Sequence, residues 1–198
     1  MKILSTADYR SMPWKNGAGS TIEIAVFPEH AQLNDFAWRV SRAQVIADGD
    51  FSHFAHVDRS LALLQGNGMC ITTDTGRHQV DQRNNIVRFA GDVVAYARLL
   101  DGAITDFNLM TCRSKCDHHL NHWVGQAIRQ IPGGTMLLYC AAGGGRLTGG
   151  GESHELGADQ TIQFSEADDL SRFSLHSDPG SRFYCAQISH VQISFVNS

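Results

Sequence analysis

The residues best suited to chemistry lie together near the N-terminus, in residues 12–23, which read Met-Pro-Trp-Lys-Asn-Gly-Ala-Gly-Ser-Thr-Ile-Glu. A proline and two glycines predict a turn, and this turn carries an indole (Trp14), an ammonium (Lys15) and a carboxamide (Asn16). Turns are usually built from Gly, Pro, Asn, Asp and Ser and seldom contain a tryptophan. Either Trp14 closes one end of the core while its two neighbours face solvent, or the three side chains together contact a ligand.

Two arginines further along the chain suit the binding of an anion. Arg39 lies in residues 36–41, where alternation places it on the same strand face as Ser41. Arg59 is a second such donor, and a guanidinium binds a carboxylate through two parallel hydrogen bonds. The alternative interpretation is that Arg59 forms a turn salt bridge with the adjacent Asp58 and that Arg39 is solvated.

Residue types also permit an acid–base pair, formed by His53 with Asp50 or Glu23, if the fold brings these groups together. No Gly-x-Ser-x-Gly motif supports a serine nucleophile. The glycine-rich run at residues 142–151 lacks the Gly-Lys-Ser/Thr of a phosphate-binding loop and is expected to form a hairpin turn. The sequence therefore predicts no catalytic residue with any specificity.

The composition excludes several classes of protein. The chain has 198 residues, of which 18% are charged and 19 are glycine, which is typical of one domain or two fused halves with many short strands. A net charge of −4 argues against nucleic-acid binding, and no apolar run is long enough to span a membrane. Asp8 precedes any apolar region of a signal peptide, and five cysteines, an odd number, indicate reduced thiols. A cytoplasmic location is expected.

Apolar residues alternate with a period of two along most of the chain, which predicts an all-β fold. In residues 21–27, for example, Ile22, Ile24 and Val26 share one face. Helical periodicity is weak, and short helical turns are expected only at 6–11 and 165–169. Strands are expected over residues 21–27, 36–41, 60–65, 68–73, 86–90, 93–100, 104–110, 135–141, 160–164, 170–175 and 182–195.

A weak internal repeat indicates how these strands are organised. The glycine turn at Gly68 is followed 24 residues later by Asp92, and Gly144 is followed 24 residues later by Asp168. A strand, a glycine turn, a returning strand and an acidic turn form the usual pattern of a cupin half-barrel. We therefore predict a bicupin, with two fused RmlC-like jelly-roll modules: residues 1–115 with the ligand site, and residues 116–198 as a degenerate module.

Metal-binding cupins present a His-x-His pair on one strand, which period two places on one face. Here His53 and His56 are three residues apart and are expected on opposite faces of a strand, and Asn108 stands where a later ligand would point inward. Cys112 and Cys116 form at most half of a zinc site. The sequence predicts no bound metal and no cofactor, and it assigns a polar connector to the histidines at 118, 119 and 122.

Residues 12–23 resemble the signature of the HutD/Ves family, Met-Pro-Trp-Lys-Asn-Gly-Gly-Gly-x-Thr-Arg-Glu. Two departures from it are Ala18 in place of Gly and Ile22 in place of Arg, and Ala55-His56 replaces a Pro-Gly pair. The likeness continues to about residue 113 through the blocks Trp38-Arg39-Val40-Ser41, Asp50-Phe51-Ser52-x-Phe54, Asp58-Arg59, Gly66-x-Gly68, Gly91-Asp92, Asp101-Gly102 and Asp106-x-Asn108-x-Met110.

The resemblance implies the same metal-free bicupin architecture. It also implies an accessory or regulatory role in histidine utilisation, through binding of a small acid such as formylglutamate or urocanate, while Ves-type relatives are linked to stress and cold response. If the replaced arginine contributes to ligand binding in the family, Ile22 predicts a different specificity here.

The hypothesis that combines these observations is a protein that binds a small carboxylate in its N-terminal half. The alternative is a metal-free cupin isomerase or hydrolase with a His/carboxylate acid–base pair. No nucleic-acid or membrane partner is expected, and a homodimer is compatible with the sequence. The predicted ligand-binding residues are Trp14, Lys15, Asn16, Glu23, Arg39, Ser41, Ser52, His53, Arg59 and Asn108.

Overall fold

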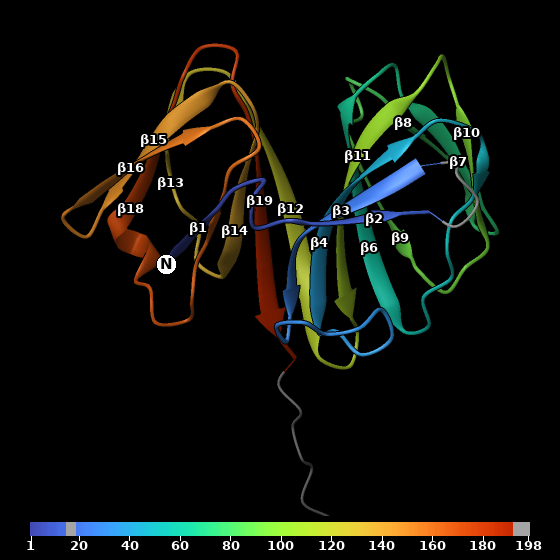
Figure 1. Ribbon diagram of the computed structural model, residues 1–198, viewed down its shortest axis with the longest axis horizontal. Helices are drawn as coiled ribbons and strands as arrows, with labels where there is room; N and C mark the ends of the chain where they lie inside the picture. The colour runs from blue at the N-terminus through green and yellow to red at the C-terminus, as the bar shows by residue number, and fades with distance from the viewer. Residues whose placement is uncertain (15–18, 192–198) are drawn as a thin grey trace, which may run out of the picture.

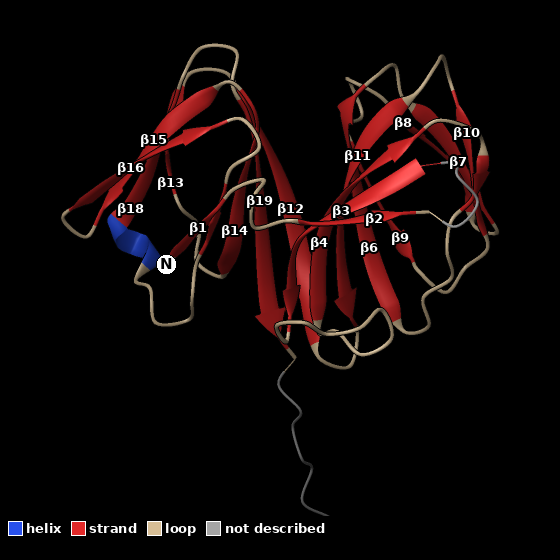
Figure 2. Ribbon diagram, in the orientation of Figure 1, coloured by secondary structure: helices blue, strands red, loops and turns tan. Residues whose placement is uncertain are grey.

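The computed structural model describes residues 1–14 and 19–191, and these residues fold almost entirely into β-strands. Figure 1 shows the strands in two groups that lie side by side, and Figure 2 shows the single short 3-10 helix of the described residues, Leu170–Arg172. The all-β prediction is confirmed. Within the described residues, no helix is long and apolar enough to cross a membrane.

The first group of strands holds most of the residues expected to bind a ligand. A six-stranded sheet has the order β2-β3-β4-β11-β6-β9, and a four-stranded sheet has the order β5-β10-β7-β8. All neighbouring strands run antiparallel. Their bounds are β2 Arg10–Pro13, β3 Gly19–Phe27, β4 Trp38–Val45, β5 Gly49–Asp50, β6 Val57–Gln65, β7 Met69–Thr73, β8 Gly76–Val80, β9 Ile86–Ala90, β10 Ala95–Leu99 and β11 Ile104–Cys112.

The second group pairs a five-stranded sheet, β1-β17-β14-β19-β12, with a four-stranded sheet, β13-β18-β15-β16. The N-terminal strand β1 thus lies in this group, antiparallel to β17, although it precedes the first group in the chain. The bounds are β1 Lys2–Leu4, β12 Cys116–Val124, β13 Ala127–Gln130, β14 Thr135–Ala142, β15 Gly144–Gly149, β16 Glu152–Gly157, β17 Thr161–Gln163, β18 Phe173–Ser177 and β19 Arg182–His190.

Several local predictions are corrected by the structure. The prediction that the histidines at 118, 119 and 122 lie in a polar connector is wrong. They belong to the nine-residue strand β12, which pairs along its whole length with β19. The glycine-rich run is mostly strand β15, with the turn confined to its end. A hydrogen-bonded turn forms within 165–169, where a turn was expected, but the 3-10 helix follows it at Leu170–Arg172, so β18 begins only at Phe173.

The alternation predicted for β3 is also interrupted. A register shift between Glu23 and Ala25 marks a β-bulge against β4. Ile24 therefore packs into the core between the two groups of strands, whereas Val26 packs against the separate cluster of Phe36 and Met110. The same bulge leaves Glu23 directly opposite Ser41, which matters for the site described below.

The two groups of strands share a hydrophobic core. One face of the six-stranded sheet packs on one face of the five-stranded sheet (Figure 1), and stacked aromatic rings belong to this shared core. Phe107 of β11 stacks between Tyr139 of β14 and Tyr184 of β19, with ring centroids 5.2 and 5.3 Å apart. The Tyr184 hydroxyl also donates to the Leu63 carbonyl, 3.0 Å away. These contacts with the second group of strands hold the six-stranded sheet in place, and its opposite face is turned toward the interior of the first group.

His118 joins the two groups by polar contacts. It is 4% exposed, and its Nδ1 lies 2.6 Å from the Thr111 hydroxyl while its Nε2 lies 2.9 Å from the Ser60 hydroxyl. Burial, together with the nearby positive charge of Arg88, lowers the pKa of His118 to about 4. The imidazole is therefore neutral at pH 7, with one nitrogen donating and the other accepting.

We expect His118 to make the protein sensitive to mild acid. The unfolded chain protonates this residue near pH 6.5 and the folded chain only near pH 4, so protons favour unfolding between these values. The loss of stability from this residue should reach about 3 kcal/mol. Urea unfolding between pH 7 and 4 measures this loss, which His118→Gln should lack. The variant is expected to have a lower free energy of unfolding than wild type at pH 7, and this difference should shrink as the pH falls. A constant deficit across the range would contradict the prediction.

Candidate functional site

Charged and amide side chains line the inner face of the six-stranded sheet, the face turned away from the second group of strands. This arrangement follows from alternation, because residues between them in the sequence, such as Trp38, Val40 and Phe107, pack into the shared core. Apolar side chains from both sheets of the first group fill the rest of that space. The buried polar residues of this inner face are Arg39, Ser41, Arg59, Asp106 and Asn108, with Glu23 beside them.

The strand register places these residues next to one another. Ser41 lies opposite Glu23 on one side and opposite Asn108 on the other. At the next position of β11 on the same face, Met110 lies opposite Arg39 on one side and opposite Arg59 on the other. Five of the predicted residues, from four strands, are thus brought onto one patch of sheet.

Arg39 is already neutralised by a carboxylate. Its Nε donates to Glu23 Oε2 at 2.7 Å, and both side chains are nearly buried, at 6% and 11% exposure. A longer contact of 3.4 Å joins its guanidinium to the Ser41 hydroxyl. This arrangement corrects the suggestion that Arg39 is solvated, and it makes Glu23 an ion-pair partner rather than a free general base.

Arg59 has a different environment, because it forms no ion pair with any carboxylate of the described residues. It is 4% exposed, and its guanidinium carbon lies 4.9, 5.2 and 5.7 Å from the ring centroids of Phe51, Phe89 and Phe54. Its one protein hydrogen bond in the described part of the chain goes to the Ser52 carbonyl at 3.4 Å. Burial lowers the pKa of Arg59 to about 10, so the group is still a cation at pH 7.

The predicted turn salt bridge between Asp58 and Arg59 is not formed. Successive strand residues point to opposite faces, so Asp58 lies on the other side of the sheet. There it accepts hydrogen bonds from Arg88 at 2.9 Å and from Arg113 at 2.5 Å. These two arginines lower the pKa of Asp58 against the opposing effect of burial. The positive charge of Arg59 is therefore available inside the first group of strands.

Asp106 is the residue of this patch that the sequence did not single out as a ligand contact. It is 2% exposed, and its Oδ1 has no hydrogen-bond partner among the described residues. Burial raises the pKa of Asp106 to about 7, although the positive charge of Arg59 opposes the shift. A usable signal was present, because Asp106 lies two residues before Asn108 and must share its strand face. The aromatic surroundings of Arg59 had no such signal, since Phe51 and Phe54 come from the loop before β6 and Phe89 comes from β9.

The remaining predicted residues lie in less regular segments. Trp14 is half-buried against the apolar interior of the first group, and its indole Nε1 donates to the Thr21 hydroxyl at 2.8 Å. Lys15 and Asn16 lie outside the described residues. Ser52 and His53 are exposed, and they precede β6 in a loop rather than a strand, so Ser52 reaches Arg59 only through its backbone carbonyl. His53 and His56 lie in this loop and turn, so the expectation that they occupy opposite faces of a strand does not apply.

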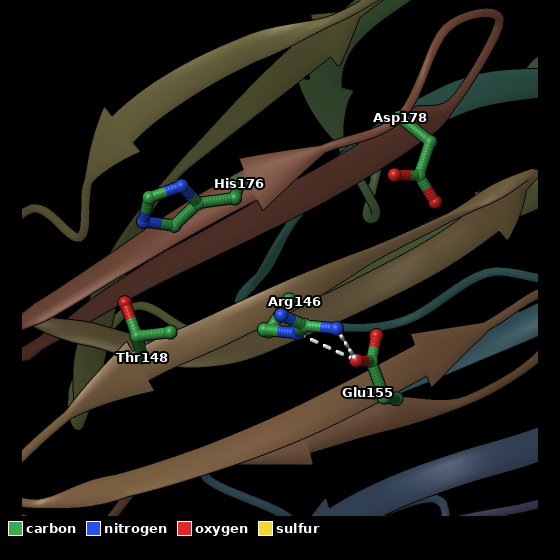
Figure 3. Close-up of a pocket in the computed structure, with 5 residues that line it drawn as sticks. All are labelled: Arg146, Thr148, Glu155, His176 and Asp178. Atoms are coloured by element: carbon green, nitrogen blue, oxygen red, sulfur yellow. Dashed lines mark hydrogen bonds and ion pairs between the residues drawn. The ribbon is translucent and has the colours of Figure 1, made fainter.

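A separate hollow of about 330 Å³ lies on the second group of strands (Figure 3). Arg146, Thr148 and His176 lie on the outward face of its four-stranded sheet, since Leu147 and Leu175 between them are buried. The Arg146 guanidinium already contacts Glu155 at 2.5 Å, and both side chains are largely exposed. An exposed, self-neutralised pair of this kind binds an anion weakly. The inner face of the six-stranded sheet is therefore the better candidate.

Within residues 1–14 and 19–191, no group of three or more His, Cys, Asp or Glu side chains is placed to hold a metal ion. None of the five cysteines forms a disulfide in the described part of the chain. The Sγ of Cys116, which was considered as half of a zinc site, lies 3.7 Å from the Nδ1 of His190.

Solved structures define the class of fold. The chain is similar to a cupin 2 conserved barrel domain protein from Leptotrichia buccalis (TM-score 0.56, 8% identity, 91% of this chain and 96% of that chain). It is also similar to a bacterial pirin from Escherichia coli solved with nickel(II) (TM-score 0.63, 10% identity, 94% and 97%). The protein thus has an all-β, cupin-like fold, here with a buried polar patch that contains two arginines on one sheet.

The family follows from more similar proteins. The HutD family model matches residues 6–183, and the chain belongs to this HutD/Ves family. A protein of the hutC 3′ region of Pseudomonas putida is 32% identical over 86% of this chain and 90% of its own length. Protein Ves of Citrobacter koseri is 39% identical over 55% of this chain and 58% of its own. The structure of HutD from Pseudomonas fluorescens superposes with a TM-score of 0.77 at 28% identity, over 96% and 99% of the two chains.

Proposed function

We propose that this protein binds a small carboxylate on the inner face of the six-stranded sheet, and that Arg59 is the main anion-binding group. The observation that supports this is a buried cation without an ion-pair partner among the described residues. Burying a charge is costly unless it is paired, so proteins seldom keep an unpaired one without a use for it. Arg39, Ser41 and Asn108 lie beside it and add polar contacts.

The proposed biological role is accessory or regulatory. Two relatives are named HutD and a protein of the hutC 3′ region, which supports a role in histidine utilisation. Other relatives are named Ves, which supports the alternative role in stress response. Formylglutamate and urocanate are the candidate ligands, since each combines a carboxylate with a small polar body. None of the five cysteines forms a disulfide among the described residues, which supports a cytoplasmic location.

We also propose that the two groups of strands are two fused cupin modules, with a boundary near residues 115 and 116. The turn between β11 and β12 falls at this point, and each module then contributes one larger and one smaller sheet. Strand β1 is the exception, because it crosses over and pairs with β17 of the second module. On this division the carboxylate site belongs to the first module alone.

Calorimetric titration with formylglutamate and urocanate tests the proposed binding function. Arg59→Ala should weaken binding by about 2–3 kcal/mol, or about 30–150-fold, the range for hydrogen bonds to a charged group. Arg59→Met should give the same loss while filling the space among the three phenylalanines. Arg39→Ala should also weaken binding. Because it leaves the nearly buried Glu23 carboxylate without its ion-pair partner, its effect is harder to assign to the ligand alone.

Arg129 provides the matched control. It also lies over an aromatic ring, 5.7 Å from the centroid of Trp123, but it belongs to the second group of strands. Arg129→Ala should leave binding within about twofold of wild type. If both Arg59 variants fold and bind the two acids as tightly as wild type does, the carboxylate site lies elsewhere.

A further inference from the structure

We propose that the second group of strands has a binding site of its own, which takes a small ligand with a primary ammonium group. The site is a hollow of about 220 Å³ where the start of β12, the end of β19 and the turn before β14 meet. It lies apart from the carboxylate site and does not depend on that function. Its lining includes Asp117, His119, Gly133, Gln187 and Ser189.

Alternation determines the face of the five-stranded sheet on which these side chains lie. Ile188 of β19 packs into the core shared by the two groups of strands. Its neighbours Gln187 and Ser189 therefore point away from the first group. The register places Gln187 opposite His119 and Ser189 opposite Asp117, so two cross-strand pairs supply four polar side chains to one face.

This face corresponds in position to the inner face that carries the carboxylate site. Strand β19 lies between β14 and β12, as β11 lies between β6 and β4. His119 is the fourth residue of β12 and Ser41 is the fourth residue of β4, while Asp117 and Arg39 are the second residues of the same two strands. A carboxylate thus stands where the first group of strands has a guanidinium, and the second hollow favours the opposite charge.

A chain of hydrogen bonds makes His119 an acceptor. The Nε2 of Gln187 donates to the Gly133 carbonyl at 2.9 Å, and its Oε1 therefore accepts from Asn121 Nδ2, also at 2.9 Å. The Oδ1 of Asn121 then faces His119 Nε2, 3.2 Å away, and receives its hydrogen. A neutral imidazole with its hydrogen on Nε2 keeps Nδ1 as an acceptor. That nitrogen can receive a donor from a ligand.

The charge beside the hollow is not fully neutralised by the protein. Asp117 contacts Arg88 at 2.6 Å, but Arg88 also contacts Asp58, at 2.9 Å. Asp58 and Asp92 are the partners of Arg113. Three carboxylates thus share two guanidinium groups, which leaves one negative charge in this network. Asp117 has the most exposed side chain of the three carboxylates, at 64%, so it is the one that a ligand reaches.

A primary ammonium group matches this lining. It carries one positive charge and three N–H donors. The acceptors on the same face are the Asp117 carboxylate, the His119 Nδ1 and the Ser189 hydroxyl. No lysine or arginine is among the described residues that line the hollow. An anionic ligand would instead meet the Asp117 carboxylate, and like charges at short range disfavour binding.

NMR titration of the full-length protein, labelled with ¹³C-histidine, tests the site at pH 8, above the ordinary pKa of an imidazole. The probe is ethylammonium chloride at constant ionic strength. The ring Cε1–H signal of His119 should shift and saturate, with a dissociation constant of about 10 mM or below, since so small a fragment binds weakly. His154 is the control within the same spectrum, because it also lies on a strand beside a carboxylate, 3.0 Å from Glu152.

Two further probes separate charge from hydrogen bonding. Ethanol lacks the positive charge, and tetramethylammonium has the charge but no N–H donor. Each should bind about fivefold more weakly than ethylammonium or worse, the upper range for an exposed charge pair.

Asp117→Asn identifies the anionic acceptor. It keeps the shape of the side chain but removes its charge, so ethylammonium should bind about fivefold more weakly or worse. Glu152→Gln removes an exposed carboxylate beside His154 and should leave the binding at His119 within about twofold of wild type. The histidine signals distant from the substitution show in each variant that the fold is kept.

Three outcomes would overturn the proposal. If the His119 signal shifts without saturation, or only as much as that of His154, the hollow is not a binding site. If ethanol or tetramethylammonium binds as tightly as ethylammonium, the ligand is not recognised as an ammonium group. If Asp117→Asn keeps the wild-type affinity, the acidic side chain does not bind the ligand.

Discussion

Replacing Phe107 by alanine is expected to lower the free energy of unfolding by about 3–5 kcal/mol, the range for removing a buried aromatic ring from a core. The ring is fully buried and stacks on Tyr139 and Tyr184, which come from the other group of strands. Truncation therefore leaves a cavity between the two groups and removes two aromatic contacts at once. Urea unfolding followed by tryptophan fluorescence measures the effect.

Phe27→Ala is the matched control for this prediction. Phe27 also stacks on an aromatic residue, Trp38, with ring centroids 5.9 Å apart, but it is 43% exposed. Its loss should cost about 1 kcal/mol or less, because little new cavity forms. A cost for Phe107→Ala as small as that of the control would show that the two groups of strands are not held together by this core.

Much of the fold was predictable because a period of two is a local property of a strand. The alternation around Arg39 and Ser41 identified both the strand and the face on which these residues lie. Strand β12 was missed because its sequence, Cys-Asp-His-His-Leu-Asn-His-Trp-Val, reads as polar. Its histidines are accommodated by partners distant in the sequence, such as Ser60 for His118 and Tyr184 for His122. No local pattern reports such partners.

Most polar members of the candidate site were predictable, but neither Asp106 nor the pairing of the charges was. Residue types indicated that Arg39, Arg59 and Asn108 suit an anion, and the register does place them on neighbouring strands. The same sequence could not show that Glu23 neutralises Arg39 and leaves Arg59 unpaired. That difference depends on a β-bulge in β3 and on three phenylalanines that the loop before β6 and strand β9 bring around Arg59. Both are products of the assembled fold.

Asp106→Asn is expected to stabilise the ligand-free protein at neutral and alkaline pH, because Asp106 is buried with an unpaired oxygen. Its pKa is raised to about 7 in the folded state, mainly by burial, against about 3.8 in the unfolded chain. Between these values the folded protein holds a proton that the unfolded chain has released, so stability falls as the pH rises. Arg59 on β6 and the Arg39–Glu23 pair on β4 and β3 are the charged groups on the same inner face.

The difference between Asp106→Asn and wild type should therefore be small at pH 4, grow as the pH rises to 7 and stay constant above it. Its size at pH 8 should be about 2–4 kcal/mol in favour of the variant. Asp81→Asn should behave in the opposite way, because hydrogen bonds from the backbone of Asn84 and from the side chain of Gln79 lower the pKa of Asp81. Any effect of that control is a loss of stability at neutral pH that disappears in acid. Urea unfolding at pH 4, 6, 7 and 8 separates the two patterns. A variant no more stable than wild type at pH 8 would mean that the Asp106 charge is already compensated within the fold.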